Sequence, residues 1–362
     1  MSRIHITYYD IADLNYASFF LAGLHLHAEI GTLAFSVSKR QPDGLKEISN
    51  GDQWQDILST ILLFKFTRDG DVFHFCIDTR DSNTSGGTGK GFHLPLLKQV
   101  RYYFKVNYNR RAIESDNYLA QHAHKIIPLS PFFPTRLPKI WPYIPSLFPP
   151  TGTSFKGAVN RVRQLKVLST LDDVRILRKR PKVRDVFFVV SYYDRHEREN
   201  EFRYQIISEL RSRSHIRSHV GFVGRNLPGR YRELQIDREL PLYEYLAEIA
   251  SSRVALYVRG VHDCLSFKFG QLLAMGMPMV GQPILNNRDK LMANPYFDVQ
   301  FAYENPREIV DRVEQLLGTP EELGRIGDSN AAVFDLRYTP EKVVGELLTG
   351  LSEPRSANEW NL

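Results

Sequence analysis

The chain has 362 residues, a length that suits two domains better than one. Of these residues 43% are hydrophobic and 24% charged, a composition typical of a globular protein. No apolar run reaches the length of a membrane span, the opening MSRIHITYYD does not resemble a signal peptide, and two cysteines exclude a disulfide framework. We therefore predict a cytoplasmic protein. The net charge of +6 and the pI of about 9.1 allow anionic partners, namely nucleotide diphosphates, anionic lipid surfaces or nucleic acid.

The first half of the chain alternates strand-like and helix-like patterns. The strand patterns cover residues 3–9, 32–37, 72–77, 102–107 and 125–129. The helical patterns cover residues 16–30, 54–64 and 93–100. This alternation predicts a mostly parallel sheet covered by helices on both sides.

Residues 131–150, PFFPTRLPKIWPYIPSLFPP, interleave seven prolines with aromatic residues. Repeated proline is incompatible with a regular helix or a central strand. We predict an extended arm whose aromatic side chains pack on the N-terminal domain. A loop that touches a membrane is the alternative, because aromatic residues near cations suit a membrane interface.

Residues 156–184 are strongly basic and mark the predicted domain boundary. We predict an N-terminal domain over 1–180, a C-terminal domain over 181–338 and a final helical segment over 339–362. Such a run of charge usually forms a solvated face. The alternative is that this segment binds anionic lipid or a lipid-linked acceptor. The basic residues are Lys156, Arg161, Arg163, Lys166, Arg175, Arg178, Lys179, Arg180, Lys182 and Arg184.

The second half repeats the alternation. Strands are predicted at 186–190, 218–223, 254–258, 279–280 and 299–303. Helices are predicted at 199–211, 241–251, 266–275, 306–317, 320–334 and 340–351. The last two helices begin with proline, which is preorganised for a helix start.

The most informative stretch is 259–280, RGVHDCLSFKFGQLLAMGMPMV, which follows the strand predicted at 254–258 and reads as polar loop, helix, Gly-x-Pro and second strand. In open α/β sheets, ligands bind at the carboxyl ends of strands. Ser266 can cap the helix, whose first N–H groups favour an anion such as phosphate. Asp263 and Gln271 are separated by about 12 Å along the helix axis, so an extended nucleotide sugar could lie across it. Alternatively, Ser266 only caps and Gln271 only faces solvent.

This stretch resembles the donor-binding segment of GT-B glycosyltransferases, in which Glu, seven residues and a second Glu precede a small-residue run and Gly-x-Pro. Asp263 and Gln271 occupy the two acidic positions, and residues 272–278 follow. The string from Tyr243 through Phe267 is similar to the exostosin-like branch. Gln271 departs from the family's Glu: its amide can still hydrogen-bond a ribose hydroxyl, without the charge.

The resemblance implies an α/β fold of two Rossmann-like domains with parallel sheets, facing each other across a cleft. It implies transfer of a sugar from a nucleotide diphosphate sugar to a hydroxyl of a glycan or lipid-linked glycan. No metal, cofactor or nucleic acid is expected, and peripheral contact with an anionic membrane surface is an open alternative. The last helix is expected to cross back to the N-terminal domain. A catalytically silent glycan-binding protein and a sugar-nucleotide epimerase of the same fold are the rival functions.

Donor-binding residues are expected where strands of the second half end. Arginines there can neutralise a diphosphate that gains charge as the bond to the sugar breaks. Candidate phosphate contacts after residues 186–190 are Ser191, Tyr193 and Arg195. The other candidate donor-binding residues are Arg225, Arg259, His262, Asp263, Cys264, Leu265, Ser266 and Gln271.

The acceptor hydroxyl needs a base, which a carboxylate of the first half could supply. Asp81 is the first candidate and Asp78 the second, because both follow an apolar strand. Alternatively, these aspartates cap turns and hold the following loop.

Two further motifs do not match the sites they suggest. Residues 86–91 lack the Gly and Ser/Thr of a phosphate-binding P-loop. Asp69-Gly70-Asp71 precedes a strand and is predicted to be a hairpin turn rather than a metal site.

Overall fold

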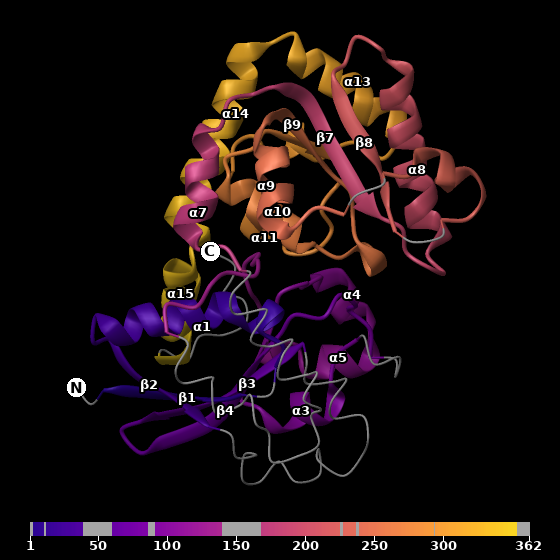
Figure 1. Ribbon diagram of the computed structural model, residues 1–362. Helices are drawn as coiled ribbons and strands as arrows, with labels where there is room; N and C mark the ends of the chain where they lie inside the picture. The colour runs from indigo at the N-terminus through magenta and orange to yellow at the C-terminus, as the bar shows by residue number, and fades with distance from the viewer. Residues whose placement is uncertain are drawn as a thin grey trace, which may run out of the picture. The chain divides into compact units, whose positions relative to one another are not determined.

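The computed structural model describes residues 3–10, 12–38, 60–85, 91–139, 168–224, 227–236, 239–292 and 294–352. It divides into two compact units (Figure 1). Unit 1 comprises Met1–Thr170 with Arg337–Leu362, and unit 2 comprises Leu171–Leu336. Each unit is an α/β structure built on a parallel-rich sheet. Within the described ranges, no helix is both long enough and apolar enough to cross a bilayer. The domain boundaries and the cleft expected from the sequence remain predictions.

The sheet of unit 1 has the strand order β2-β1-β3-β4-β5-β6. Five of the strands run parallel, and β3 runs antiparallel to both of its neighbours. The expectation of a parallel sheet is therefore wrong for β3. The strands are β1 (Ile4–Tyr9), β2 (Leu33–Ser38), β3 (Ile61–Arg68), β4 (Asp71–Asp78), β5 (Tyr102–Lys105) and β6 (Ile126–Pro128).

The helix predicted over 54–64 is wrong at its described end, because residues from Ile61 onward form β3. Ile61 to Phe64 are fully buried, and a continuous apolar run has no period that separates a buried strand from a helix. The hairpin turn predicted at Asp69-Gly70-Asp71 is confirmed. Asp69 and Gly70 have φ values of 51° and 86°, and Arg68 pairs with Asp71.

One helix pair in unit 1 joins the two ends of the chain, since α15 packs against α1 (Figure 1). A Cβ added at Gly23 of α1 would lie 2.2 Å from the carbonyl oxygen of Pro340, so the approach requires glycine. Phe132 and Phe133 of the proline-rich segment also pack on α1, as the sequence predicted for an arm; 140–150 lie outside the described residues. The helices are α1 (Leu14–Glu29), α3 (Leu94–Gln99), α4 (Arg110–Ser115), α5 (Asn117–Gln121) and α15 (Pro340–Ser352).

The sheet of unit 2 has the order β10-β9-β7-β8, with every pair parallel. Its strands are β7 (Arg184–Ser191), β8 (Ser218–Val223), β9 (Ser252–Tyr257) and β10 (Met279–Gly281). Its helices are α7 (Leu171–Ile176), α8 (Glu197–Ser212), α9 (Leu242–Ala250), α10 (Phe267–Ala274), α11 (Arg288–Leu291), α12 (Phe297–Gln300), α13 (Pro306–Leu317) and α14 (Pro320–Val333). The strand predicted at 299–303 is wrong, because α12 extends to Gln300 and Phe301 packs on the rings of Tyr257 and Phe269.

Alternating side chains of β7 face opposite layers of helices. Val186, Phe188 and Val190 join the core that contains residues of α8 and α13, whereas the ring of Phe187 packs on Tyr245 of α9. The strand that follows β7 in the chain, β8, lies on one side of β7, and the next strand, β9, lies on its other side. The carboxyl end of β7 is therefore a topological switch point, where α/β sheets bind ligands.

Basic side chains stabilise three helix ends in unit 2. Arg178 Nε donates to the carbonyl of Ala274 at 2.7 Å, Lys182 Nζ to Ala250 at 2.8 Å, and Arg253 to Leu317 at 2.9 Å. These carbonyls end α10, α9 and α13, and a cation is favourable at a helix C-terminus. Arg178 and Lys182, which belong to the predicted basic segment, thus stabilise the ends of α10 and α9.

A buried amide network fixes the turn between α10 and β10. The Asn330 side chain donates to the Met277 carbonyl at 2.7 Å and to the side chain of Gln300 at 2.8 Å. Asn330→Ala is expected to lower the free energy of unfolding by about 2 kcal/mol, because these buried acceptors lose their donor. Urea denaturation measures this loss. Ser329→Ala, on the half-buried edge of the network, is the control and should change stability by less than about 1 kcal/mol.

Candidate functional site

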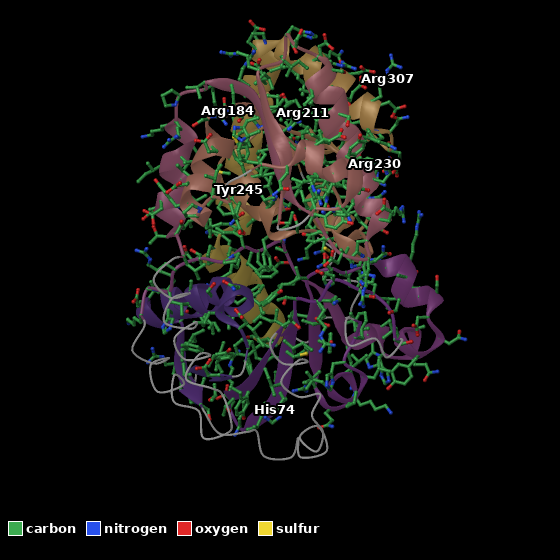
Figure 2. All side chains as sticks on the ribbon, turned by 45° about the vertical axis from the view of Figure 1, so that its right-hand side comes forward. His74, Arg184, Arg211, Arg230, Tyr245 and Arg307 are labelled. Carbon is green, nitrogen blue, oxygen red and sulfur yellow. The ribbon has the colours of Figure 1, made fainter. Side chains whose placement is uncertain are left out.

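A cavity of about 220 Å³ lies in unit 2 at the carboxyl ends of β7 and β9. Its apolar walls come from the sheet and from α9 and α10, and include Phe187, Tyr257 and Leu272. Polar residues from the loops after β7 and β9 also line it. Tyr245 of α9, which is labelled in Figure 2, also lines the cavity. The cavity therefore combines an apolar interior with polar groups at the switch point.

The N-terminus of α10 opens on this cavity, because Ser266, Phe267 and Lys268 line it. Ser266 occupies the N-cap position, but its side chain makes no capping hydrogen bond. The partial positive charge of the helix end therefore lies beside the cavity and favours an anion.

Arg203 of α8 is a buried cation on the cavity wall, with 5% of its surface exposed. It donates to the carbonyl of Ser191 at 3.1 Å, and its guanidinium lies 4.5 Å from the ring centroid of Tyr193. Its Nε is buried without a hydrogen-bond partner. Burial lowers the pKa of Arg203, and Tyr193 and the carboxylate of Glu199 oppose this shift. Among the described residues, no carboxylate forms an ion pair with this guanidinium.

Lys268 lies in the first turn of α10 and is the second cation of the cavity. Its Nζ donates to the Val189 carbonyl at 3.4 Å and lies 4.9 Å from the ring centroid of Tyr245. Burial lowers the pKa of Lys268 to about 8, an effect that Tyr193 opposes and Arg203 reinforces. No ion pair joins Lys268 to a carboxylate in the described ranges.

Sequence reasoning missed both cations, although each carries a signal. Arg203 occupies the buried stripe of α8, with Asn200, Ile206 and Leu210, where a charge is unusual. Lys268 stands in the first turn of a helix, the end at which a cation is unfavourable. Each residue departs from the preference of its position in the helix, and such departures concentrate at functional sites.

Three of the predicted donor residues line the cavity, namely Ser191, Tyr193 and Ser266. Asn200 fixes Tyr193, because its side chain accepts from the Tyr193 N–H at 3.1 Å and donates to the Tyr193 carbonyl at 2.7 Å. Arg195 has φ of 66° and an exposed side chain, and is not a lining residue. Arg225 lies outside the described residues.

Arg259 is held by carboxylates rather than directed at an anion. Its guanidinium lies 3.4 Å from a carboxylate oxygen of Asp263 and 3.0 Å from one of Glu304, and the residue is 7% exposed. Its backbone N–H donates to the side chain of Gln282 at 3.0 Å. These contacts neutralise the guanidinium and favour a role in holding the loop after β9, in contrast to the predicted contact with a diphosphate.

The loop before α10 stores backbone strain. His262 and Asp263 have φ values of 59° and 57°, a left-handed conformation that is uncommon in two successive residues other than glycine. Asn286 donates to the Asp263 carbonyl at 3.2 Å and supports this conformation. Strain of this kind clusters at binding and catalytic sites.

The remaining predicted donor residues are buried in unit 2. Cys264 and Leu265 are buried, and Gly260 closes the loop by donating to the Cys264 carbonyl at 3.1 Å. Gln271 is buried on α10 but is not a cavity-lining residue. Its contact with a ribose hydroxyl therefore stays a prediction.

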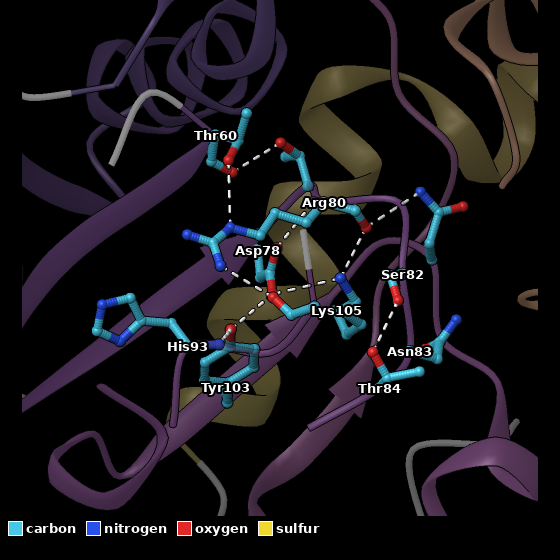
Figure 3. A network of polar contacts seen from close by, with 12 residues as sticks. Thr60, Asp78, Arg80, Ser82, Asn83, Thr84, His93, Tyr103 and Lys105 are labelled. Carbon is cyan, nitrogen blue, oxygen red and sulfur yellow. Dashed lines mark hydrogen bonds and ion pairs between the residues drawn. The ribbon is translucent and has the colours of Figure 1, made fainter. Parts of the chain in front are cut away.

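Asp78, one of the two predicted acceptor residues, belongs to a buried polar network in unit 1 (Figure 3). Asp78 and Lys105 are both 0% exposed and lie 3.3 Å apart. Asp78 also accepts from the Tyr103 hydroxyl at 2.5 Å and from the Arg80 N–H at 2.8 Å, and Lys105 donates to the Arg80 carbonyl at 2.7 Å. Asp78 has no surface for an acceptor hydroxyl, which favours a structural role. Asp81 is exposed in the loop that this network holds.

Potential metal ligands do not gather among the described residues of either unit. Over the described ranges, no group of three or more His, Cys, Asp or Glu residues is placed to hold an ion. Both cysteines, Cys76 and Cys264, are buried free thiols.

Residues 197–349 match a family model described as glycosyl transferase-like. This segment contains α8 and α10, and hence both cavity cations. The match supports a glycosyltransferase-like domain and does not extend to the exostosin-like branch that the sequence suggested. No curated protein matches the chain significantly.

Three solved structures resemble the chain distantly. A structure from Listeria monocytogenes described as a UDP-N-acetylglucosamine 2-epimerase has 11% identity and a TM-score of 0.48, over 97% of this chain and 96% of that one. The UDP-GlcNAc 2-epimerase from Neisseria meningitidis, bound to UDP-GlcNAc, has 12% identity and a TM-score of 0.40, over 94% and 96%. BGT of phage T4, in complex with its UDP-glucose substrate, has 11% identity and a TM-score of 0.30, over 95% and 91%. At TM-scores this low, the likenesses support no conclusion about activity.

Proposed function

We propose that this protein transfers a sugar from a nucleotide diphosphate sugar to a hydroxyl group of a glycan or lipid-linked glycan. The observation that carries the proposal is the open N-terminus of α10 beside a cationic cavity, within the segment that matches the glycosyl transferase-like model. When the bond between the anomeric carbon and the diphosphate oxygen breaks, the leaving group gains negative charge. Positive charge fixed beside it stabilises that transition state.

The remaining residues have assigned roles within this proposal. Ser191 and Tyr193 contact phosphate at the cavity, and the strained loop with His262 and Asp263 faces the sugar. Gln271 contacts a ribose hydroxyl. Asp81 is the candidate base that accepts the proton of the acceptor hydroxyl. Transfer needs no metal in this scheme, because fixed protein charges stabilise the leaving diphosphate.

Calorimetric titration with UDP, GDP, ADP and CDP, with and without a chelator, tests donor binding directly. Binding that survives the chelator supports the proposal, and the absence of binding for all four nucleotides contradicts it. Incubation with a nucleotide sugar alone then separates the rival functions. An epimerase converts the donor sugar, a silent glycan-binding protein leaves it unchanged, and a transferase releases the nucleotide by slow hydrolysis.

Asp263→Asn is expected to lower kcat/KM for transfer by about a hundredfold, because it removes the charge that orders Arg259 and faces the sugar. Asparagine tolerates the left-handed conformation, so the melting temperature should stay near that of the wild type. Asp263→Ala is the matched comparison and should lose both turnover and thermal stability. Full turnover in Asp263→Asn would remove this carboxylate from the site.

A further inference from the structure

We propose that Arg203 and Lys268 form a two-cation site that binds the diphosphate of the donor, an inference that rests on the proposed function. The two side chains come from helices on opposite faces of the sheet and line one cavity at the end of β7. Arg203 reaches the carbonyl of Ser191, and Lys268 reaches that of Val189, two residues earlier in the same strand. A single anion in the cavity can therefore be adjacent to both.

The charge balance of the cavity favours an anion as the occupant. Two buried or half-buried cations share one cavity, and the described residues form no ion pair with either of them; Glu199 attracts Arg203 only at longer range. Burial of a charge that has no ion-pair partner is costly, and like charges in one cavity add to that cost. An anion with two negative charges removes both penalties on binding.

Arg203 also has a hydrogen-bond donor left for a ligand. One of its terminal nitrogens donates to Ser191, whereas its buried Nε has no partner. A guanidinium has five N–H donors in a planar fork that matches phosphate oxygens. The unused Nε–H is the kind of group that native interiors rarely leave unsatisfied.

The guanidinium is held in place before any ligand arrives. It stacks on Tyr193, and the side chain of Asn200 holds the Tyr193 backbone by two hydrogen bonds. A cation fixed in this way loses little freedom on binding. The same stacking leaves Tyr193, which is 39% exposed, at the mouth of the cavity.

The size of the cavity limits which part of the donor it takes. Its volume of about 220 Å³ is below the roughly 300 Å³ at which pockets hold a whole drug-sized ligand. A diphosphate can enter while the nucleoside and the sugar extend outward. Inorganic pyrophosphate is therefore a suitable probe of this site alone.

Lys268 gives the site a pH dependence. The groups that face it are Arg203 from α8, Tyr193 from the loop after β7 and Tyr245 from α9. Because its pKa lies at about 8, a rise in pH through that value removes its charge and weakens anion binding. Anion binding at pH 8 should in turn raise the pKa of Lys268, so the complex takes up protons.

The experiment compares the wild-type protein with Arg203→Met, Lys268→Met and the control Arg307→Met. Arg307 is a cation of unit 2 outside the cavity (Figure 2). Calorimetric titration with pyrophosphate and UDP should show affinities about ten- to hundredfold lower in both cavity variants and unchanged in the control. Lys268→Met should melt no lower than the wild type, because it removes a poorly solvated charge. A merely structural lysine would lower the melting temperature.

Proton uptake on UDP binding, measured in buffers of different ionisation enthalpy, tests the unmodified protein. Uptake at pH 8 that disappears at pH 6.5 and in Lys268→Met supports the proposal. Equal affinity in the wild type and both cavity variants overturns the two-cation site while leaving sugar transfer intact. No binding of pyrophosphate or UDP by the wild type also overturns it. Pyrophosphate binding without turnover of any nucleotide sugar contradicts the proposed function and leaves the anion site standing.

Discussion

Lys105→Met is expected to lower the free energy of unfolding by about 3–5 kcal/mol, because it leaves Asp78 as an uncompensated charge in the interior of unit 1. Neither residue has exposed surface, and burial lowers the pKa of Lys105 while Asp78 opposes the shift. Tyr103 and Arg80 still donate to Asp78 in the variant, but neither of those hydrogen bonds replaces the lost ammonium group. Urea denaturation followed by circular dichroism measures the loss.

A double variant, Asp78→Asn with Lys105→Met, removes both charges and should recover part of the lost stability. Asp71→Ala is the surface control, since its ion pair with Arg101 is about half exposed and should contribute less than about 1 kcal/mol. The single variant Asp78→Asn distinguishes the two roles considered for this residue. A structural aspartate loses stability on substitution, whereas a catalytic base would leave the fold intact and abolish turnover.

Gly23→Ala is expected to destabilise the protein by about 3 kcal/mol. The added Cβ would lie 2.2 Å from the carbonyl oxygen of Pro340 and 2.5 Å from a methyl carbon of Val344. The first of these atoms belongs to the backbone at the start of α15 and cannot rotate away. Thermal unfolding should report the lower stability, and limited proteolysis should show earlier cleavage near α15.

Gly324→Ala is the matched control, with the same substitution in another helix. No heavy atom lies within 4 Å of a Cβ added at Gly324 in α14, so alanine should raise stability by about 0.5–1 kcal/mol. Opposite signs at the two glycines would show that close helix packing, and not helix propensity, governs position 23. A neutral result at Gly23 would mean that α15 can move away from α1 at little cost.

In both units, buried polar side chains hold the residues that follow the carboxyl end of a strand. In unit 1, Asp78 and Lys105 anchor the backbone of Arg80, the residue before Asp81. In unit 2, Asn200 and Arg203 anchor Tyr193 from the buried side of α8. Substitution of Asp78 or Lys105 is therefore expected to displace Asp81, and substitution of Asn200 or Arg203 to displace Tyr193. Each substitution should also lower the stability of its unit.

Local patterns were sufficient for much of this protein. The alternation of apolar residues predicted most strands and helices near their observed bounds, because periods of two and 3.6 residues are properties of a segment by itself. The turn chemistry of Asp69 and Gly70 predicted the hairpin for the same reason. Residues 254–280 predicted a strand, a loop, a helix with an anion-favouring start and a second strand, and β9, α10 and β10 occupy the places of the two strands and the helix.

Only the tertiary structure decided which of these parts act together. The run from Ile61 to Phe64 is a strand because it pairs with β1 and β4, and no local period could show that. Arg259 is neutralised because the fold brings Glu304 to it. Arg203 and Lys268 meet at one cavity because two helices from opposite faces end at the same strand. Which distant residues come together depends on how the connections between strands order them in the sheet. The periodicity of a single segment carries no information about that order.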